Sequence, residues 1–186
     1  MTRIISGFAG SLTLAVPSTG TRPTSERVRE AIFSALEARD AISGCAVLDL
    51  YAGSGALGLE AASRGATRVT LVESGAQALK ACRANGALLS KKAPFPLSVE
   101  VSGAPVQSFL ESSRDTWDLV FIDPPYELSN TDLARALVAL VPRLAPDAVV
   151  MLERASRDAA PVWPEGLELE KLKKYGDTAV YWLSLA

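Results

Sequence analysis

AVLDLYAGSGALGLEAASR, residues 46–64, places a short apolar run, a glycine loop and a helical stretch in direct succession. Ala46–Leu50 has the length and the continuous apolar character of a buried strand. Ala56–Arg64 has the composition of a helix, and the glycines between the two segments predict a tight turn. A strand that opens through such a turn into a helix N-terminus is typical of the first unit of an α/β sheet.

Strand-like and helix-like segments alternate from Ser43 to the end of the chain. Apolar runs predict strands over Arg68–Glu73, Leu97–Val101, Leu119–Ile122 and Ala148–Glu153, and helical spacing predicts helices over Gln77–Leu88, Val106–Glu111 and Asp132–Leu140. Leu167–Lys174 and Thr178–Leu185 flank the turn signal Tyr175-Gly176-Asp177, which predicts a hairpin at a sheet edge. The expected fold class is α/β: a Rossmann-like, mainly parallel sheet with helices on both faces and an antiparallel C-terminal hairpin.

Residues 1–40 are expected to form a small appendage to the main domain, residues 41–186. Arg3–Ser6 and Leu12–Leu14, with glycines between them, predict a β-hairpin. A helix follows, for which Thr24 is the expected N-cap and Glu26 lies in the first turn.

The composition is that of a globular chain with one domain: 186 residues, 48% apolar and 22% charged. The net charge of −2 gives no overall attraction to nucleic acid, so such contacts need a local basic patch. The chain has no histidine, which excludes histidine-based catalysis and histidine-containing metal sites, and we expect no metal. Cys45 and Cys82 form no disulfide framework, and no apolar stretch approaches the ~20 residues of a spanning helix. We expect a soluble, cytoplasmic monomer with no membrane partner.

The glycine loop Gly53-Ser54-Gly55 is the first candidate binding site, since parallel α/β sheets bind ligands at the carboxyl ends of their strands. Glu73 ends the next strand, where a carboxylate can accept hydrogen bonds from two ribose hydroxyls. Gly53, Gly55 and Gly58 also satisfy the dinucleotide pattern G-x-G-x-x-G, so a nicotinamide-dependent oxidoreductase is an alternative. Asp49, shortly before the loop, would repel a pyrophosphate but suits the cationic end of S-adenosylmethionine, and it favours that cofactor.

The tetrapeptide Asp123-Pro124-Pro125-Tyr126 is the second candidate site and the predicted catalytic element. It follows an apolar run that is expected to neighbour the first strand. The prolines remove backbone donors and hold the chain extended, which leaves carbonyls free to accept hydrogen bonds. The Asp123 carboxylate and the Pro124 carbonyl could hold the two N–H groups of a nucleobase amine, while Tyr126 stacks on the base. A strand terminator with a buried tyrosine is the purely structural alternative.

Four blocks of sequence resemble the RsmD family of amino-group N-methyltransferases: TRPTSERVRE at residues 21–30, DLYAGSGALGLEA at 49–61, RGA at 64–66 and KYGDT at 174–178, together with the tetrapeptide at 123–126. The resemblance covers nearly the whole chain. It implies a Rossmann-like, S-adenosylmethionine-dependent methyltransferase that modifies the N2 amine of a guanine in bacterial 16S rRNA. The implied partner is this rRNA in an assembled or assembling small ribosomal subunit.

The resemblance also implies roles for individual residues. The cofactor-binding set is Asp49, Tyr51, Ala52, Gly53, Ser54, Gly55, Glu73 and Ala104, of which Ala104 would meet the adenine. Arg22 and Thr24 would lie near the cofactor or the RNA, and Arg27 and Arg29 are expected to contact phosphates. The chain departs from the family where Ser6–Leu14 carries no Lys or Arg, since the family's N-terminal hairpin usually carries several.

The sequence leaves two further alternative functions open. An N6-adenine DNA methyltransferase shares the tetrapeptide, but the chain has no evident target-recognition domain. A non-catalytic nucleic-acid-binding module would not need acidic residues at three strand ends, as Asp49, Glu73 and Asp123 are placed.

Overall fold

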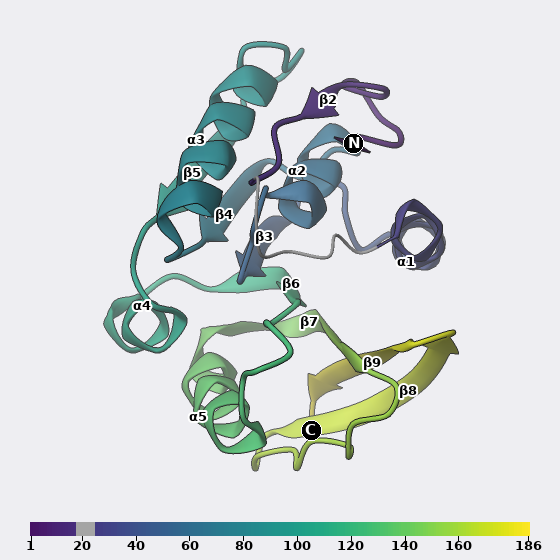
Figure 1. Cartoon of the computed structure of the whole chain (residues 1–186), viewed down its shortest axis with the longest axis vertical. Helices are drawn as coiled ribbons and strands as arrows, with labels where there is room; N and C mark the ends of the chain where they lie inside the picture. The colour runs from purple at the N-terminus through teal and green to yellow at the C-terminus, as the bar shows by residue number, and fades with distance from the viewer. Residues whose placement is uncertain (18–24) are drawn as a thin grey trace.

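The computed structural model of the chain describes residues 1–17 and 25–186, and seven of the strands in these residues form one sheet. The sheet order is β5-β4-β3-β6-β7-β9-β8 (Figure 1). The strands are β3 (Ala46–Leu50), β4 (Arg68–Val72), β5 (Ser98–Ser102), β6 (Trp117–Ile122), β7 (Leu144–Ala155), β8 (Leu167–Tyr175) and β9 (Thr178–Leu185). Strands β3 to β7 pair in parallel, while β9 pairs antiparallel with β7 and β8. The mainly parallel sheet with an antiparallel C-terminal hairpin is therefore confirmed.

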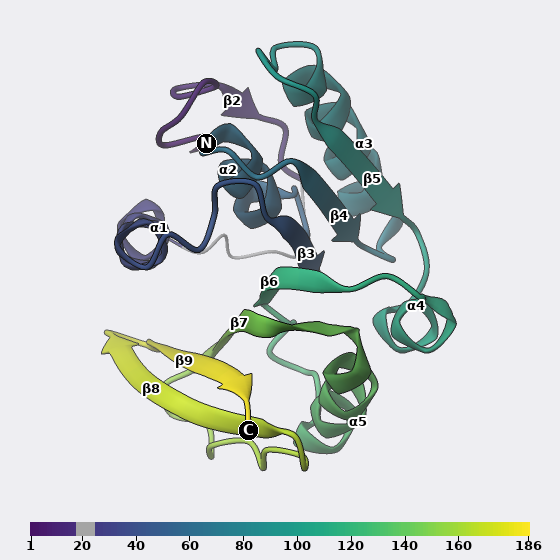
Figure 2. The same ribbon diagram turned by 180° about the vertical axis from the view of Figure 1, so that it is seen from behind.

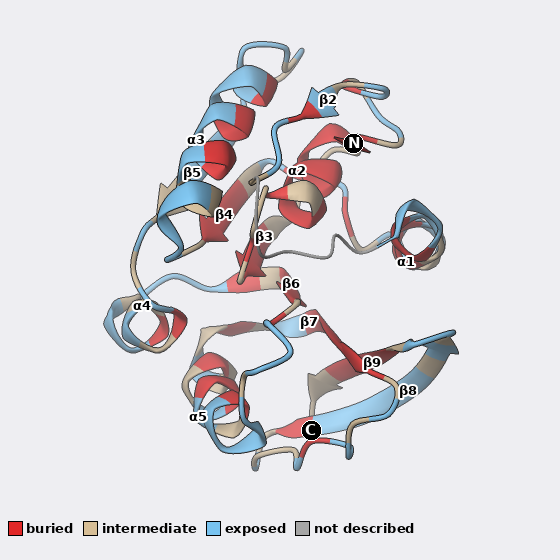
Figure 3. Ribbon diagram, in the orientation of Figure 1, coloured by how far each residue is buried: buried red, intermediate tan, exposed pale blue. Residues whose placement is uncertain are grey.

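Helices cover both faces of the sheet (Figures 1 and 2). One face carries α1 (Glu26–Ala38), α2 (Ala56–Ser63) and α3 (Ala76–Ser90), and the other carries α4 (Val106–Ser112) and α5 (Asn130–Leu140), which a 3-10 turn at Val141–Arg143 follows. Each face has its own cluster of buried apolar side chains, so the strands are buried from both sides (Figure 3). In the part of the chain that the structure describes, no helix is long and apolar enough to cross a membrane.

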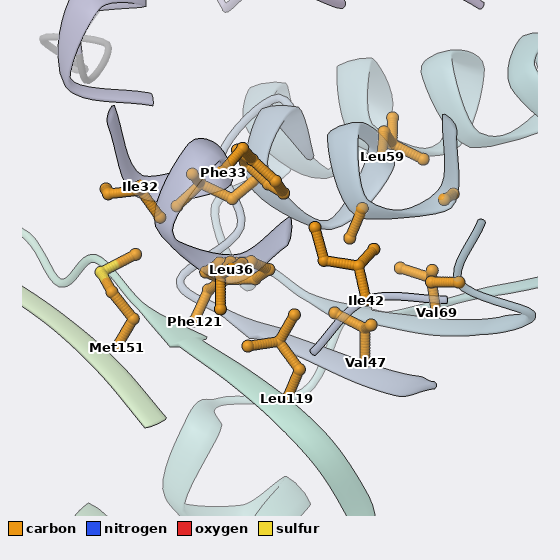
Figure 4. Packing of buried hydrophobic residues seen from close by; sticks show 14 of the residues in the cluster. Ile32, Phe33, Leu36, Ile42, Val47, Leu59, Val69, Leu119, Phe121 and Met151 are labelled. Carbon is orange, nitrogen blue, oxygen red and sulfur yellow. The ribbon is translucent and has the colours of Figure 1, made fainter. Parts of the chain in front are cut away.

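Helix α1 is part of the core rather than a peripheral addition. Its side chains Phe33 and Leu36 are fully buried, and the Phe33 ring centroid lies 5.5 Å from that of Phe121 on β6. Figure 4 shows this helix face lying over Leu119, Phe121 and Met151. The segment predicted as an appendage thus shares one hydrophobic cluster with the sheet.

Helix α1 begins one residue later than the predicted cap implies. The Ser25 hydroxyl accepts a hydrogen bond from the Val28 N–H at 3.2 Å, so Ser25 is the N-cap. Thr24, the predicted cap, lies outside the described residues.

The N-terminal hairpin is shorter than predicted because α2 takes its hydrogen bonds. Only Thr2–Arg3 (β1) and Thr13–Leu14 (β2) pair as strands within the described residues. The Ile4 N–H still donates across the hairpin to the Leu12 carbonyl at 2.9 Å. The N–H groups of Ile5 and Ser6 instead donate at 2.7 and 3.0 Å to the carboxylate of Glu60, which is fully buried on α2. The hairpin is therefore docked on the helix that follows the glycine loop.

Strand β7 extends from Leu144 to Ala155, beyond the predicted Ala148–Glu153. The polar and proline-containing start, Ala145-Pro146-Asp147, interrupts the apolar run and hides this part of the strand from sequence analysis. The register against β6 shifts between Trp117 and Leu119, so the added residues belong to an irregular pairing.

Candidate active site

The carboxyl ends of three neighbouring strands bring three acidic residues together. Strand β3 lies between β4 and β6, so Asp49, Glu73 and Asp123 all face the same edge of the sheet. Burial raises the pKa of Asp49 well above its usual value, the hydrogen bond from the Gly58 N–H lowers it, and the negative charges of Asp123 and Glu73 raise it further. The three acidic residues that the sequence predicts at strand ends therefore lie close enough to influence one another electrostatically.

The glycine loop turns sharply between β3 and α2. Three of its residues have left-handed backbone conformations: Tyr51 with φ 60°, Gly53 with φ 58° and Gly55 with φ 82°. The loop is tied to the end of β4 by the Ala52 N–H, which donates to the Val72 carbonyl at 3.0 Å. A left-handed Tyr51 is uncommon for a residue with a side chain, and it marks a backbone held in place by its surroundings.

Glycine is needed at position 58 because α2 packs closely on the sheet there. A Cβ at this position would lie 2.5 Å from Leu71 Cδ2 and 3.1 Å from Asp49 Cβ. This close approach lets the Gly58 N–H donate to Asp49 Oδ2 at 2.9 Å. One of the free N–H groups of the α2 N-terminus is thereby occupied by a carboxylate.

Glu73 braces the loops on either side of it. Its Oε2 accepts from the Gly53 N–H at 2.8 Å, and its Oε1 accepts from the Gly75 N–H at 2.6 Å. An ionised carboxylate offers about four acceptor positions, so about two remain for a ligand. Glu73 therefore has the acceptor capacity for a ribose diol while it also fixes the glycine loop.

A cavity of about 300 Å³ lies beside these strand ends, between the sheet and helices α4 and α5. This volume is at the lower end of the range for small-molecule sites. Its lining residues are Tyr51, Val72, Glu73, Ser74, Pro105, Val106, Gln107, Leu128, Asp132, Arg135 and Ala136. Two predicted cofactor residues, Tyr51 and Glu73, lie in the wall, and the residues directly after Ala104 form another part of it. Burial raises the pKa of Tyr51 to about 12, so its phenol stays neutral.

The tetrapeptide after β6 presents its aromatic ring to the surface. Pro124 is buried, whereas Pro125 is exposed and the Tyr126 side chain is 54% exposed. The Pro125 carbonyl accepts from the Leu128 N–H at 3.0 Å and closes a turn. A tyrosine that only terminated the strand would be expected to pack in the core, and the exposure of Tyr126 counts against that alternative.

Sequence analysis missed a buried arginine that holds the chain after the tetrapeptide. The Arg154 guanidinium on β7 donates to the Leu128 carbonyl at 3.1 Å and to Asn130 Oδ1 at 3.4 Å, and it lies 3.7 Å from an Asp158 carboxylate oxygen. Its side chain is 5% exposed. The signal in the sequence is a charged residue at the end of the apolar run Val149–Leu152. Arg154 fixes the loop that carries the exposed tyrosine.

The predicted RNA-binding residues fall into three groups. Arg27 is exposed on α1, where it is free to contact a ligand at the surface. Arg29 is only 2% exposed and donates to the Arg3 carbonyl at 3.0 Å, so the prediction of a phosphate contact for Arg29 is wrong. Its position on the helix face that also carries the core residues Phe33 and Leu36 explains this burial. Arg22 and Thr24 lie outside the described residues.

Known proteins resemble this chain in sequence and structure over most of its length. Ribosomal RNA small subunit methyltransferase D of Escherichia coli is 34% identical over 178 residues, which cover 95% of this chain and 86% of that protein. Its counterpart from Haemophilus influenzae is 33% identical over 177 residues, which cover 94% of this chain and 89% of that protein. The solved structure of yhhF from Escherichia coli, named as a candidate methyltransferase, aligns with a TM-score of 0.82 at 34% identity and covers 98% of this chain and 97% of its own.

A family match covers nearly the whole chain as well. Residues 2–184 match the family described as Conserved hypothetical protein 95. The match includes the glycine loop, the three acidic strand ends and the C-terminal hairpin. The chain therefore belongs to the Conserved hypothetical protein 95 family, the RsmD family that its sequence blocks resemble.

Proposed function

We propose that the protein is an S-adenosylmethionine-dependent methyltransferase that modifies the N2 amine of a guanine in 16S rRNA. The observation that carries this proposal is the convergence of Asp49, Glu73 and Asp123 around the glycine loop, within a chain of the RsmD family. Asp49 and Glu73 would bind the cofactor, and Asp123 would bind the amine that receives the methyl group.

The electrostatics of the loop favour a cationic cofactor over a dinucleotide. The Gly58 N–H, which a pyrophosphate would need at the α2 N-terminus, already donates to Asp49. The carboxylates of Glu73 and Asp123 would repel the pyrophosphate and attract the sulfonium and amino groups of S-adenosylmethionine. Glu73 would accept the ribose hydroxyls, and the segment from Ala104 to Gln107 would lie against the adenine.

The reaction needs the amine to be positioned more than it needs acid–base chemistry. S-adenosylmethionine supplies an activated methyl group on a positively charged sulfur. The amine of guanine is a weak nucleophile because its lone pair is delocalised into the ring. Asp123 and the Pro124 carbonyl would accept the two N–H groups and favour a pyramidal nitrogen, whose lone pair then points at the methyl carbon.

The bonds that form and break in the transfer step can be stated for this arrangement. With the cofactor bound, the N–C bond would form as the C–S bond breaks, the bonding pair would stay on the sulfur as a neutral thioether, and the amine would lose one proton to Asp123 or to water. Holding two reactants in line can lower the activation barrier by about 7–11 kcal/mol. Stacking on Tyr126 would contribute about 1–3 kcal/mol to holding the base.

The substrate assignment rests on the family, since its relatives are named for ribosomal RNA. Contacts with RNA phosphates would come from exposed cations such as Arg27 and the Lys171–Lys174 stretch, with Arg22 as a further candidate in the sequence. We infer a cytoplasmic monomer that acts on an assembled or assembling small ribosomal subunit. A guanine that is paired in the RNA would have to leave its helix to reach Asp123.

A binding measurement separates the proposed cofactor from the dinucleotide alternative. We expect isothermal titration calorimetry to show saturable binding of S-adenosylmethionine and S-adenosylhomocysteine and no measurable binding of NADH, because the acidic loop disfavours a pyrophosphate. Tight binding of NADH with no binding of either adenosyl compound would contradict the proposal.

A further inference from the structure

Asn85 on α3 uses its whole amide group to join two separate parts of the chain. Its Oδ1 accepts from the Ala15 N–H at 2.8 Å, and its Nδ2 donates to the Ala15 carbonyl and to the Ser54 carbonyl, each at 2.8 Å. The residue is 2% exposed. The pattern of one donor and two acceptors around it fixes which side of the amide carries the oxygen.

The two partners of Asn85 lie in the glycine loop and directly after β2. Ser54 is the middle residue of the glycine loop, and the Gly53 N–H beside it donates to Glu73. Ala15 follows β2, whose Leu14 is buried in the core cluster of the α1–α3 face. One side chain therefore joins the N-terminal segment, residues 1–17, to the glycine loop.

Two other side chains that anchor the described N-terminal residues, Glu60 and Ser63, lie on α2 rather than in this loop. Ser63 at the end of α2 donates to the Ser6 carbonyl at 2.6 Å and accepts from the Ala9 N–H at 3.0 Å. Glu60, one turn earlier, holds Ile5 and Ser6. These contacts dock the hairpin on α2, at a distance along the helix from the loop at its N-terminus.

We propose that Asn85 is a positioning residue that couples the docked N-terminal segment to the conformation of the glycine loop. The inference rests on the proposed cofactor site. When Ala15 is held, Nδ2 is oriented toward Ser54 and the loop keeps its binding geometry. Because coupling between two sites is reciprocal, cofactor binding should also stabilise the N-terminal segment.

The test compares two Asn85 variants with a matched control. Asn85→Ala removes all three hydrogen bonds, and Asn85→Asp keeps the acceptor for the Ala15 N–H but, as a carboxylate, cannot donate to the Ala15 or Ser54 carbonyls. Ser63→Ala removes side-chain hydrogen bonds at Ser6 and Ala9 and leaves all three Asn85 hydrogen bonds in place. By calorimetry, the affinity for S-adenosylhomocysteine should fall about tenfold in both Asn85 variants and less than about twofold in Ser63→Ala. Circular dichroism and urea unfolding establish that the compared proteins are folded at the temperature of the titration.

A second measurement uses the unmodified protein and does not depend on how well the variants fold. Adding S-adenosylhomocysteine to the parent protein should slow amide hydrogen exchange in residues 10–17. Equal affinities for the parent and the folded Asn85 variants, or unchanged exchange in residues 10–17 of the ligand-bound parent, would overturn the inference alone. Failure of the parent to bind any adenosyl compound would instead overturn the proposed function, and this inference with it.

Discussion

Asp123→Ala should lose most of its methyl transfer and keep its affinity for the cofactor. The Asp123 carboxylate lies at the end of β6, next to Asp49 on β3 and beyond the glycine loop that would hold the cofactor. Its proposed hydrogen bond to the amine strengthens as positive charge develops on the nitrogen, so it acts mainly in the transition state. Removing one such partner typically costs about 100- to 1,000-fold in rate. Single-turnover transfer assays and calorimetry with S-adenosylhomocysteine would measure the two quantities separately.

Glu127→Gln is the matched control for this substitution. Glu127 is an exposed carboxylate in the same loop, directly after Tyr126. Its replacement should leave the transfer rate close to that of the parent. If Asp123→Ala transfers methyl groups at nearly the parent rate, the role assigned to Asp123 is wrong.

Glu73→Ala is expected to weaken cofactor binding as its main effect, whereas Asp123→Ala is expected to leave that binding unchanged. The variant loses the proposed hydrogen bonds to the ribose, and hydrogen bonds to a charged group are each worth about 1.5–3 kcal/mol. It also leaves the Gly53 and Gly75 N–H groups without their acceptor, which loosens the glycine loop. Since about 1.4 kcal/mol is a factor of ten, we expect the dissociation constant for S-adenosylhomocysteine to rise at least about tenfold.

Asp118→Asn provides the comparison for Glu73. The Asp118 Oδ2 accepts from the Ala46 N–H at 2.8 Å, so this carboxylate also braces a backbone N–H of the sheet. It does so where β3 begins, at the opposite edge from the cofactor loop. Its replacement should leave the affinity for S-adenosylhomocysteine unchanged. An affinity in Glu73→Ala equal to that of the parent would rule out the ribose assignment.

The central sheet and the acidic strand ends could be predicted because their signals are local. Ala46–Leu50 forms strand β3 as predicted, and Thr178–Leu185 forms β9 with the predicted bounds. Continuous apolar runs that end in glycine or proline mark both the buried strand and the point where it stops. Parallel strands then bring residues such as Asp49 and Asp123 to the same edge without any further information.

The parts that sequence analysis missed depend on contacts between distant segments. Glu60 and Asn85 each appear in the sequence as a polar residue within a largely apolar helix face, a signal that predicts burial but not the partner. Each has partners in residues 5–15, far away along the chain. Arg29 was misassigned for the same reason, since the composition of α1 does not show that the hairpin covers this side chain. The docking of the N-terminal segment is therefore a property of the folded chain.

The most direct test of the account is to identify the nucleoside that the protein methylates. The protein would be incubated with S-adenosylmethionine labelled in its methyl group and with separate pools of unmodified small ribosomal subunits, free 16S rRNA and DNA. Digestion to nucleosides and chromatography then locate the label. We predict that the label appears in N2-methylguanosine from an RNA-containing pool and that Asp123→Ala prevents its appearance. Label in N6-methyladenine of the DNA, or no labelled nucleoside from any pool although the protein binds S-adenosylmethionine, would contradict the account.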